Sequence, residues 1–494
     1  MAATASADGP LVGAIGSFAR AHPKAPAIVT DDAVVSYGQL IALVSNVAQA
    51  LHRAGLRPGE LTGVTFQSPA VTLVVLVALA RIGAISVNTR SRMPPPERDA
   101  IYRRFGVARE VCDGTTPPVA GCGRLVVNAL EARGDEWELD ALPFAPDRDT
   151  PLRLALTSGT TGEAKAVMQT HGSFVERMRQ MQCGDMREAR VLPPPLHVTA
   201  ALNMAMLALC EGGTVFLVRD DTPAAFLGAL ARHRITHLGL PPANLALLLR
   251  ELREDRVAFP EVRHLRLMGG TPSAALADLA RRRFSPRIYV PYGLGEIGVA
   301  AMATPDLVAR DPASSGRVAP GATVQVLDAS GAPCAPGESG EIRVAIEGMP
   351  EGYHGPDRAD RSRFRDGWFY PGDRGRLSAD GLVYIEGRAD DVINAGGRKA
   401  APAYLERVLE SHPLVQQAAV FGWEEAGSVS VAAVIVPSGP VDWRALHAFA
   451  LARLSTLAPA RYFEARELPR GELAKLDRAR VMASFTGAKP AFVT

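Results

Sequence analysis

Short apolar runs alternate with amphipathic stretches through about the first 390 residues of the chain. The apolar runs are rich in Val, Ile, Leu and Phe and are bounded by Gly, Pro or Asn, a pattern typical of β-strands. They occur at residues 61–67, 84–88, 213–218, 235–241, 264–270 and 287–293. Residues 36–55 and 244–255 instead carry apolar side chains at i, i+3 and i+4, which predicts helices. Strands that alternate with helices predict α/β sheets with crossover connections.

The pattern changes from about residue 319. Residues 323–345 predict a β-hairpin around a Gly- and Pro-rich turn, and residues 381–387 predict another strand, so we expect a β-rich subdomain at about 319–388. Residues 387–402 are charged, rich in glycine and end in Pro402, which predicts a linker. The remaining residues predict a small α+β unit. Its helices are expected at 403–412 and 442–454 and its strands at 418–423 and 429–436.

Composition and charge narrow the class of protein. The chain of 494 residues is 47% hydrophobic and 21% charged, which is ordinary for a globular enzyme of more than one domain. Its formal net charge of +2 gives no indication of a nucleic-acid or anionic-membrane partner. The five cysteines are scattered without a C-x-x-C pair, so neither a disulfide framework nor a zinc site is expected.

Two apolar or terminal segments bear on the compartment. Residues 71–80 form the most apolar window, but this window is too short to span a bilayer and predicts a buried helix. The first ten residues lack the basic and apolar regions of a signal peptide. We therefore expect a cytoplasmic protein.

The stretch LTSGTTGEAKAVMQTH, from Leu156 to His171, predicts a strand followed by a turn of small residues. Glycines allow backbone N–H groups to approach a ligand, hydroxyls add donors and a lysine adds charge, so the loop suits phosphate oxygens. Its residues are Thr157, Ser158, Gly159, Thr160, Thr161, Gly162 and Lys165. It is not a Walker A loop, because the spacing differs and Ala166 follows the lysine. Taken alone, it could equally be a polar surface turn.

Further short segments follow this loop in a fixed order. They are PPPLHVTAALN with His197, MGGTP at Met268–Pro272, YVPYGLGEIG at Tyr289–Gly298, the long block at Gly367–Lys399 and ELPRGELAKLDRARV with Lys475. In this order the chain resembles the adenylate-forming superfamily of acyl- and aryl-CoA synthetases, adenylation domains and firefly-type luciferases. The resemblance covers almost the whole chain. It implies an α/β fold with a large N-terminal domain, 1–388, built from two α/β sheet subdomains and the β-rich subdomain, a hinge at 389–391, and a small mobile α+β C-terminal domain, 392–494.

The chemistry of this superfamily explains the residue types. A carboxylate is a poor electrophile because its leaving group would be oxide, so the acid first attacks the α-phosphate of ATP. The products are an acyl-adenylate and pyrophosphate, and a thiol usually attacks the adenylate next. Phosphoryl-type charge needs positioning and electrostatic stabilisation more than covalent help. The loop from Thr157 to Lys165 would then clamp the β- and γ-phosphates.

The resemblance also assigns residues to the nucleotide. Tyr292 would stack on the adenine, and Asp373 would accept hydrogen bonds from the ribose hydroxyls. The residues expected to contact ATP or AMP are Thr157, Ser158, Gly159, Thr160, Thr161, Gly162, Lys165, Gly269, Gly270, Thr271, Tyr292, Gly293, Asp373 and Arg388.

Catalysis and domain movement are assigned in the same way. Glu296 would hold Mg²⁺, a hard cation that prefers carboxylate oxygen. Lys475 would reach the α-phosphate and the carboxylate, with Asp390 as the hinge that moves it. Gly396 and Gly397 would line a pantetheine tunnel. The resemblance therefore implies Mg²⁺ as cofactor and ATP and CoA as co-substrates.

The acid pocket is expected to be small and largely apolar. Amino-acid-activating relatives place an aspartate just after the position of His197, where this chain has Val198, so an α-amino acid is not expected. The pocket residues are expected to be His197, Val198, Thr199, Leu240, Gly270, Gly293 and Val299, with His197 also counted as catalytic. They suit an aromatic or medium-chain aliphatic acid, and the local sequence looks closest to benzoate-type aryl-CoA ligases.

The sequence departs from the superfamily pattern at several positions. Gly295 stands where threonine is usual, and Ala164 and Ala166 flank Lys165 in place of proline and glycine. Ala474 and Tyr404 are further departures. One lost neutral hydrogen bond is worth only about 0.5–1.5 kcal/mol, so a working enzyme is still expected.

Three functions remain open at this level. The first is an acyl- or aryl-CoA ligase. The second is a stand-alone adenylation enzyme that loads a carrier protein, and the third is a degenerate protein that binds ATP or an adenylate without turnover. We expect a small-molecule acid, ATP and either CoA or a carrier protein as partners, and a monomer or homodimer.

Overall fold

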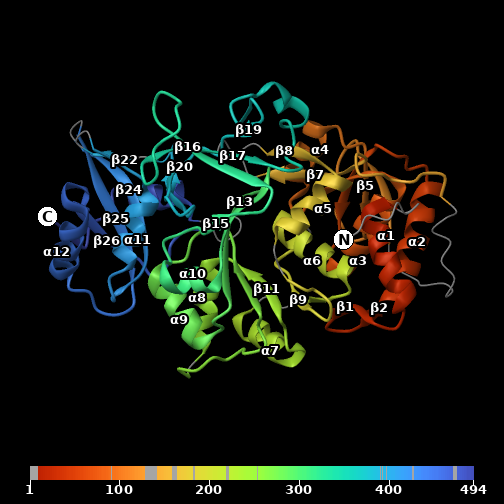
Figure 1. Ribbon diagram of the computed structural model, residues 1–494, viewed down its shortest axis with the longest axis horizontal. Helices are drawn as coiled ribbons and strands as arrows, with labels where there is room; N and C mark the ends of the chain where they lie inside the picture. The colour runs from red at the N-terminus through yellow and green to blue at the C-terminus, as the bar shows by residue number, and fades with distance from the viewer. Residues whose placement is uncertain are drawn as a thin grey trace.

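A computed structural model describes residues 9–90, 92–127, 142–157, 164–181, 184–218, 222–252, 254–389, 391, 393–395, 398–425, 428–470 and 476–494. The described chain forms an elongated molecule with the C-terminal domain at one end and the first helices near the other (Figure 1). Its main sheets are one of nine strands, two of six strands and one of four strands. The α/β class and the division into a large and a small part, as predicted, are both present.

The nine-stranded sheet carries the longest run of parallel strands. Its order is β15 (Arg317–Val318), β14 (Gly298–Ala303), β13 (Ile288–Leu294), β12 (His264–Leu267), β11 (His237–Leu240), β9 (Arg190–Leu192), β10 (Thr214–Leu217), β1 (Pro26–Thr30) and β2 (Val34–Ser36). The central strands pair in parallel, as expected when helices connect them. Over it lie α7 (Pro223–His233), α8 (Pro242–Glu251), α9 (Ala274–Arg283) and α10 (Pro305–Arg310).

A six-stranded sheet lies nearer the N-terminal end. Its order is β6 (Gly123–Val126), β5 (Arg109–Cys112), β3 (Leu61–Thr65), β4 (Ile85–Asn88), β7 (Pro151–Thr157) and β8 (Lys165–Thr170). The last two strands are antiparallel and the others parallel. The sheet is accompanied by α4 (Pro95–Phe105).

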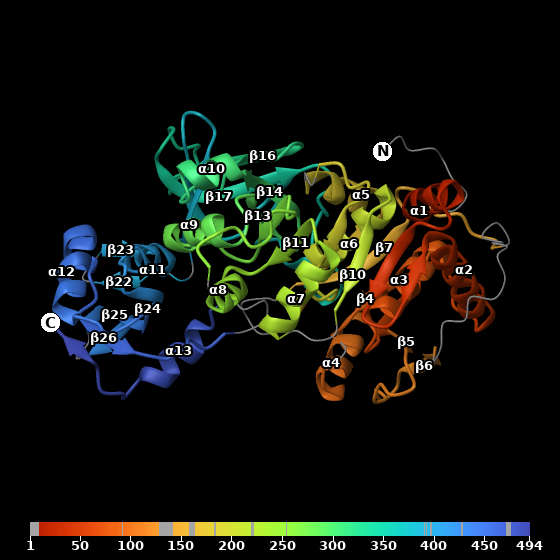
Figure 2. The same ribbon diagram turned by 90° about the horizontal axis from the view of Figure 1, so that it is seen from below.

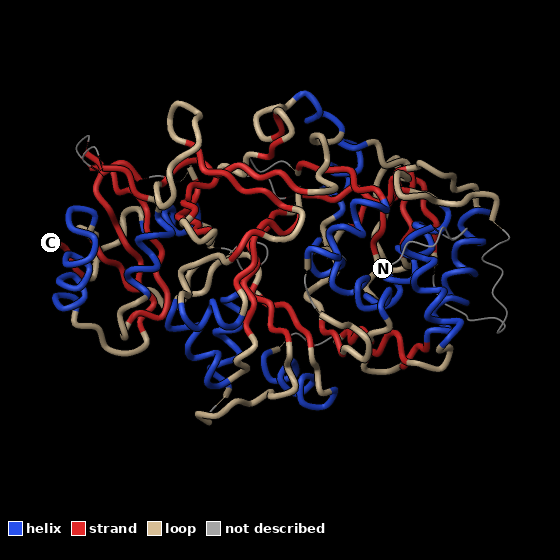
Figure 3. Tube along the Cα trace, in the orientation of Figure 1, coloured by secondary structure: helices blue, strands red, loops and turns tan. Residues whose placement is uncertain are grey.

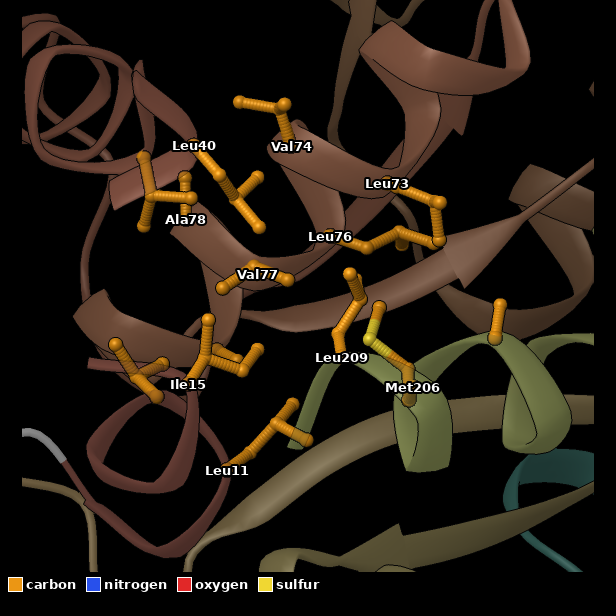
Figure 4. Close-up of a cluster of buried hydrophobic side chains, with 14 of the residues drawn as sticks. Leu11, Ile15, Leu40, Leu73, Val74, Leu76, Val77, Ala78, Met206 and Leu209 are labelled. Atoms are coloured by element: carbon orange, nitrogen blue, oxygen red, sulfur yellow. The ribbon is translucent and has the colours of Figure 1, made fainter. Parts of the chain in front are cut away.

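Helices fill the space between these two sheets. They are α1 (Gly9–Ala21), α2 (Tyr37–Arg53), α3 (Pro69–Ile82), α5 (His171–Gln180) and α6 (Thr199–Glu211). Figure 4 shows side chains of α1, α3 and α6 meeting in one apolar cluster, among them Ile15, Val77 and Leu209. The same core includes Val215 of the nine-stranded sheet and Val64 of the six-stranded sheet. These helices therefore fix the two sheets relative to each other, and Figure 2 shows α1 to α3 from a second side.

The predicted apolar window at residues 71–80 lies inside α3, whose residues from Thr72 to Ile82 are all buried. This confirms a buried helix. Among the helices in the described part of the chain, none combines the length and the apolar character needed to cross a membrane.

The β-rich part is a second six-stranded sheet. It contains β16 (Ala322–Leu327), β17 (Ser339–Ile346), β18 (Phe364–Arg365), β19 (Trp368–Phe369), β20 (Asp373–Leu377) and β21 (Val383–Arg388), with the short 3₁₀ helix η2 (Gly355–Ala359) between β17 and β18. The predicted hairpin at 323–345 is present as β16 and β17. Ile342 and Phe369 pack with Ile297 and Val167, so this sheet rests on the other two. Figure 3 shows its strands running along one edge of the large domain.

The C-terminal part is a small α+β unit, as predicted. A four-stranded sheet of β24 (Val415–Glu425), β25 (Ser428–Pro437), β26 (Arg461–Glu464) and β27 (Phe492–Val493) packs with α11 (Pro402–Glu410), α12 (Trp443–Leu454) and η3 (Ser455–Leu457). Helix α13 (Arg478–Phe485) follows near the end of the chain. The unit has its own apolar core, which includes Leu405, Val420 and Ile435.

The predicted linker at 387–402 is wrong in part. It contains a pair of antiparallel strands, β22 (Ile393–Ala395) and β23 (Arg398–Ala400). Ile393 is buried against the core of the C-terminal unit, and this burial ties the segment to that unit. The domain boundary at 389–391 stays a prediction, and Asp390 lies outside the described residues.

An internal ion pair connects α4 to the N-terminal sheet. Arg98 Nε of α4 lies 3.0 Å from Glu110 Oε1 of β5, and both side chains are fully buried. The same carboxylate accepts hydrogen bonds from Thr65 and Tyr102 at 2.7 and 2.8 Å. Because both charges are removed from water, each depends on the other.

We therefore expect Arg98→Met to lower the free energy of unfolding by about 3–5 kcal/mol, because it leaves the buried Glu110 carboxylate without a cation. Arg103→Met on the same helix is the control, since the Arg103 side chain is 75% exposed and its ion pair with Asp99 is expected to contribute at most about 1 kcal/mol. Urea titration of both variants measures the difference. Equal losses in the two variants would show that Arg98 has no special role.

A titrating carboxyl lies in the C-terminal unit. Burial raises the pKa of Glu410 to about 7, although the backbone N–H of Ala418 donates to its carboxylate. A carboxyl whose pKa is raised in the folded state binds protons more tightly there than in the unfolded chain. Its stabilising contribution is therefore complete below about pH 4.5 and is lost as the pH rises through about 7.

Glu410→Gln should remove this dependence. Between pH 5 and pH 8 the wild-type protein should lose up to about 3 kcal/mol of unfolding free energy relative to the variant. The measurement is urea titration of both proteins across this pH range, with the exposed Glu424→Gln as control. Parallel pH profiles for wild type and Glu410→Gln would contradict the raised pKa.

Candidate functional site

A cleft of about 970 Å³ opens between the large domain and the C-terminal unit. The large domain contributes residues of the nine-stranded and β-rich sheets, and the C-terminal unit contributes α11 and the start of α13. Among the lining residues are several that the sequence assigned to the nucleotide, namely Gly269, Gly270, Thr271, Tyr292, Gly293, Asp373 and Arg388. Residues about 120 positions apart in the chain therefore meet in one place.

Strand ends explain this convergence. Gly269–Thr271 follow β12 directly, and Tyr292 and Gly293 lie in the last part of β13. Ligands of α/β sheets bind at the carboxyl ends of such strands. Asp373 begins β20 and is paired in register with Arg388, the last residue of β21, so this pair comes from the β-rich sheet.

Tyr292, Asp373 and Arg388 form one hydrogen-bonded group. The Tyr292 hydroxyl donates to Asp373 Oδ2 at 2.7 Å, and Arg388 Nη1 lies 3.4 Å from Oδ1. Arg388 also donates to the carbonyl of Pro371 at 2.7 Å. Burial, and then the charge of Asp373, raise the pKa of Tyr292 well above its usual value, so the phenol stays a donor. The orientation of the tyrosine ring is thus fixed by the carboxylate that was expected to bind ribose.

The predicted phosphate loop lies between two paired strand ends. Residues 158–163, which include Ser158, Gly159, Thr160, Thr161 and Gly162, are outside the described residues. Thr157, at the end of β7, is paired with Lys165, at the start of β8. The loop is therefore the connection of an antiparallel hairpin.

Lys165 is held by the β-rich domain. Its Nζ lies 2.7 Å from Asp360 Oδ2 and 4.8 Å from the centre of the Tyr353 ring. The ammonium group, together with hydrogen bonds from Ser362, lowers the pKa of Asp360. To reach a phosphate, the lysine would have to exchange this carboxylate for the ligand.

Gly295 and Glu296 lie on a turn between β13 and β14. A β-carbon at position 295 would stand 3.3 Å from the methyl carbon of Thr157, so glycine lets the turn pack closely on the start of the phosphate loop. Arg177 of α5 donates from Nη1 to the carbonyl of Gly295 at 2.8 Å and from Nη2 to the carbonyl of Glu296. The backbone at Glu296 is therefore held in place by a side chain of α5.

Sequence reasoning missed Arg177 and its neighbour Arg153. Burial lowers the pKa of Arg177 to about 9 and that of Arg153 to about 10, and Arg153 adds to the effect on Arg177. Arg153 lies in an otherwise apolar strand, "LRLAL", just before the phosphate loop. The charged side chain of Arg153 inside an apolar strand was the feature of the sequence that could have revealed it.

The expected acid pocket is described in part. His197 is exposed and Val198 is the N-cap of α6, with Thr199 as the first helical residue. Arg153 Nη2 is 3.5 Å from Thr199 Oγ1. Leu240 is buried at the end of β11, while Gly270 and Gly293 line the cleft and Val299 lies in β14. The side chain of His197 is thus accessible to solvent.

Several assigned residues lie outside the described residues. They are Lys475, Asp390, Gly396 and Gly397, in addition to the phosphate-loop residues named above. Their roles stay predictions. Leu476 and Arg478 on the C-terminal side of Lys475 line the cleft, so the described chain resumes beside the site.

Comparison with known proteins shows where the chain belongs. Residues 17–354 match the model of the AMP-binding enzyme family. A feruloyl-CoA synthase of Amycolatopsis is 31% identical, with 85% of this chain and 87% of that protein covered. A 2-succinylbenzoate–CoA ligase of Geobacillus kaustophilus is 30% identical, with 90% and 91% covered.

Solved structures agree with this grouping. The o-succinylbenzoate coenzyme A synthetase of Bacillus subtilis in complex with ATP and magnesium superposes with a TM-score of 0.83 at 26% identity, covering 95% of this chain and 98% of that chain. The superfamily resemblance, the fold class and the expected class of enzyme, an AMP-forming acid–CoA ligase, are confirmed by these matches. The chain belongs to the AMP-binding enzyme family.

Proposed function

We propose that the protein activates a carboxylic acid with ATP as an acyl-adenylate and then transfers the acyl group to the thiol of CoA. The observation that carries the proposal is the Tyr292–Asp373–Arg388 group in a cleft shared by two domains. A partly buried aromatic ring beside a fixed carboxylate suits a nucleoside, whose base stacks and whose sugar hydroxyls donate. ATP and CoA as co-substrates fit the relatives that are CoA ligases.

The nucleotide would lie along the strand ends. Gly269–Thr271 present small residues to the flat base, and Tyr292 offers its ring. The ribose hydroxyls would share Asp373 with the tyrosine hydroxyl, since both carboxylate oxygens are already in contact with side chains. The triphosphate would extend toward the hairpin loop after Thr157.

Glu296 fits a role in holding Mg²⁺. Its backbone is anchored by Arg177, and within the described chain its carboxylate makes no ion pair or hydrogen bond. A hard cation such as Mg²⁺ prefers carboxylate oxygen, so Glu296 would be the residue of this chain that holds the ion. Bound Mg²⁺ would neutralise phosphate charge as the bond to the α-phosphate changes.

Lys475 is proposed as the residue that stabilises charge at the α-phosphate during adenylation. It belongs to the C-terminal unit, which forms one wall of the cleft. Because the C-terminal unit carries Lys475, movement of this unit would bring the lysine into place for adenylation. The transfer to the thiol would then use a different orientation of the unit.

The acid and the acceptor are the finer parts of the proposal. The relatives include ligases named for ferulate, 2-succinylbenzoate, indoleacetate and sulfoacetate. Most carry an aromatic group, which favours an aryl acid for this chain. A fatty acid–acyl-carrier-protein ligase of Streptomyces coeruleorubidus is 29% identical, so a carrier protein is the second candidate acceptor.

The first experiment measures AMP and pyrophosphate release with ATP, Mg²⁺ and a panel of benzoates, cinnamates and aliphatic acids, with and without CoA. CoA-dependent AMP release together with the mass of an acyl-CoA supports the proposal. Adenylate formation that CoA does not accelerate, but a phosphopantetheinylated carrier does, would support the second acceptor. Nucleotide binding without any product would overturn the enzymatic function.

Lys475→Ala should reduce pyrophosphate release by at least about 100-fold, because it removes a cation aimed at developing charge. Thioester formation from chemically prepared acyl-adenylate should change by less than about threefold, because that step does not use the lysine. Lys489→Ala, which is exposed in the same domain, is the control. A loss of equal size in both half-reactions would contradict the assignment.

Asp373→Asn should raise the KM for ATP by about 10- to 100-fold, since a hydrogen bond to a charged group contributes about 1.5–3 kcal/mol. Tyr292→Phe keeps the ring and should change this KM by less than about tenfold. Tyr292→Ala removes the stacking face and should have the larger effect. Steady-state kinetics with ATP varied will distinguish them, and equal effects of the two tyrosine variants would argue against stacking.

A further inference from the structure

Two arginines lie buried beside the expected acid pocket. Arg153 comes from β7 and Arg177 from α5, and their residue exposures are 5% and 2%. They are close enough for one to lower the pKa of the other. Arg153 also reaches α6, whose first residue is Thr199. Figure 1 shows α5 and α6 next to each other in this region.

Arg177 has an evident structural task, but Arg153 has not. Arg177 donates to two consecutive backbone carbonyls. Arg153 is 3.5 Å from the Thr199 hydroxyl, which is the long limit of a hydrogen bond, and its Nη1 is buried with no hydrogen-bond partner. Neither arginine forms an ion pair with a carboxylate in the described part of the chain. Of the two terminal nitrogens of Arg153, one thus has no partner and the other has only a long contact.

A second positive group lies at the same place. Helix α6 has 13 residues, and its N-cap, Val198, provides no side-chain acceptor for the first backbone N–H groups. Such an uncapped N-terminus carries partial positive charge and attracts anions. The buried guanidinium and the helix end therefore meet at Thr199. Asn203, one turn further along α6, adds a buried amide whose Oδ1 has no partner.

A buried cation without a counter-charge is unfavourable unless an anion joins it. The opposite charge that acts on the pKa of Arg177 is that of Glu296, which is proposed above to serve the metal. Among the described residues no carboxylate pairs with Arg153, so a ligand anion would compensate its charge. Guanidinium groups bind carboxylates and other oxyanions through paired N–H donors.

We propose that Arg153 and the N-terminus of α6 bind a second anionic group of the acid substrate. The substrate class is therefore an acid with two ionised groups, either a dicarboxylate or a carboxylate with a sulfonate. One carboxylate reacts with ATP, while the other group stays ionised at Arg153. The inference rests on the acid-activating function proposed above and on Thr199 as part of the acid pocket.

The test compares matched pairs of acids. Each pair is a dicarboxylic acid and its monoamide, which has nearly the same shape but one negative charge fewer. The acids are benzene-1,4-dicarboxylate, 3-(2-carboxyphenyl)propanoate and hexanedioate. Pyrophosphate release gives kcat/KM for each. For the wild-type protein, we expect the best diacid to exceed its monoamide by about 10- to 100-fold, the range for a charge-assisted hydrogen bond.

Arg153→Met should remove this preference while changing kcat/KM for the monoamide by less than about threefold, and Arg153→Lys should keep part of it. The control is Arg81→Met, because Arg81 is also buried and donates to the carbonyl of Phe144, which is not one of the residues expected in the acid pocket. This control should leave the preference unchanged. The ratio of kcat/KM for the diacid to kcat/KM for its monoamide is informative even if a variant is less stable. Both values are measured on the same fraction of folded enzyme, so this fraction cancels in the ratio.

The outcomes separate the two levels of the proposal. Activation of monoamides and monoacids in preference to every diacid would overturn the second anionic group and leave the ligase function standing. Equal loss of both acids in Arg153→Met would show that Arg153 acts only on the structure, which also overturns the inference. Absence of pyrophosphate release with every acid would instead overturn the proposed function itself.

Discussion

The hydrogen bond from Tyr292 to Asp373 connects the nine-stranded sheet to the β-rich sheet, which is a separate sheet. Tyr292 lies near the end of a strand of the nine-stranded sheet, and Asp373 begins a strand of the β-rich sheet. The Tyr292 hydroxyl oxygen lies 2.7 Å from Asp373 Oδ2, and the apolar cluster that contains Ile342 and Ile297 packs the two sheets against each other. The candidate site thus depends on packing that lies behind it, and changes in that core would alter the nucleotide side of the cleft.

The buried arginines show how differently one residue type can be used. Arg98 is neutralised by Glu110, and Arg266 donates to the backbone carbonyl of Met181. Arg177 also donates hydrogen bonds to backbone carbonyls. In Arg98, Arg177 and Arg266 the nitrogen without a hydrogen-bond partner is Nε, whereas in Arg153 it is the terminal Nη1, and the best contact of Arg153 is long. A buried guanidinium with an unpartnered terminal nitrogen is a group that a ligand anion would satisfy.

The regular elements could be predicted from the sequence because their cause is local. The alternation at 323–345 and the apolar window at 71–80 are found as β16–β17 and α3. The segment at 387–402 was misjudged, because its charge and glycine content suggested a linker while the burial of Ile393 is a long-range effect. Arg177 could not be predicted as an anchor of Glu296, since nothing in the local pattern of α5 indicates what its side chain meets 118 residues later.

The site was predicted as a set of roles, and the structure adds how those roles are coupled. Asp373 and Tyr292 were assigned separately, yet each is the partner of the other. The ion pair of Lys165 with Asp360 is another such coupling. It affects how nucleotide binding depends on ionic strength. Both side chains are partly exposed, so ionic strength weakens their attraction. A phosphate that captures Lys165 would replace one anion by another, so screening acts on both states. This lysine should therefore add little to the salt sensitivity of nucleotide binding, although it carries a full charge toward a polyanion.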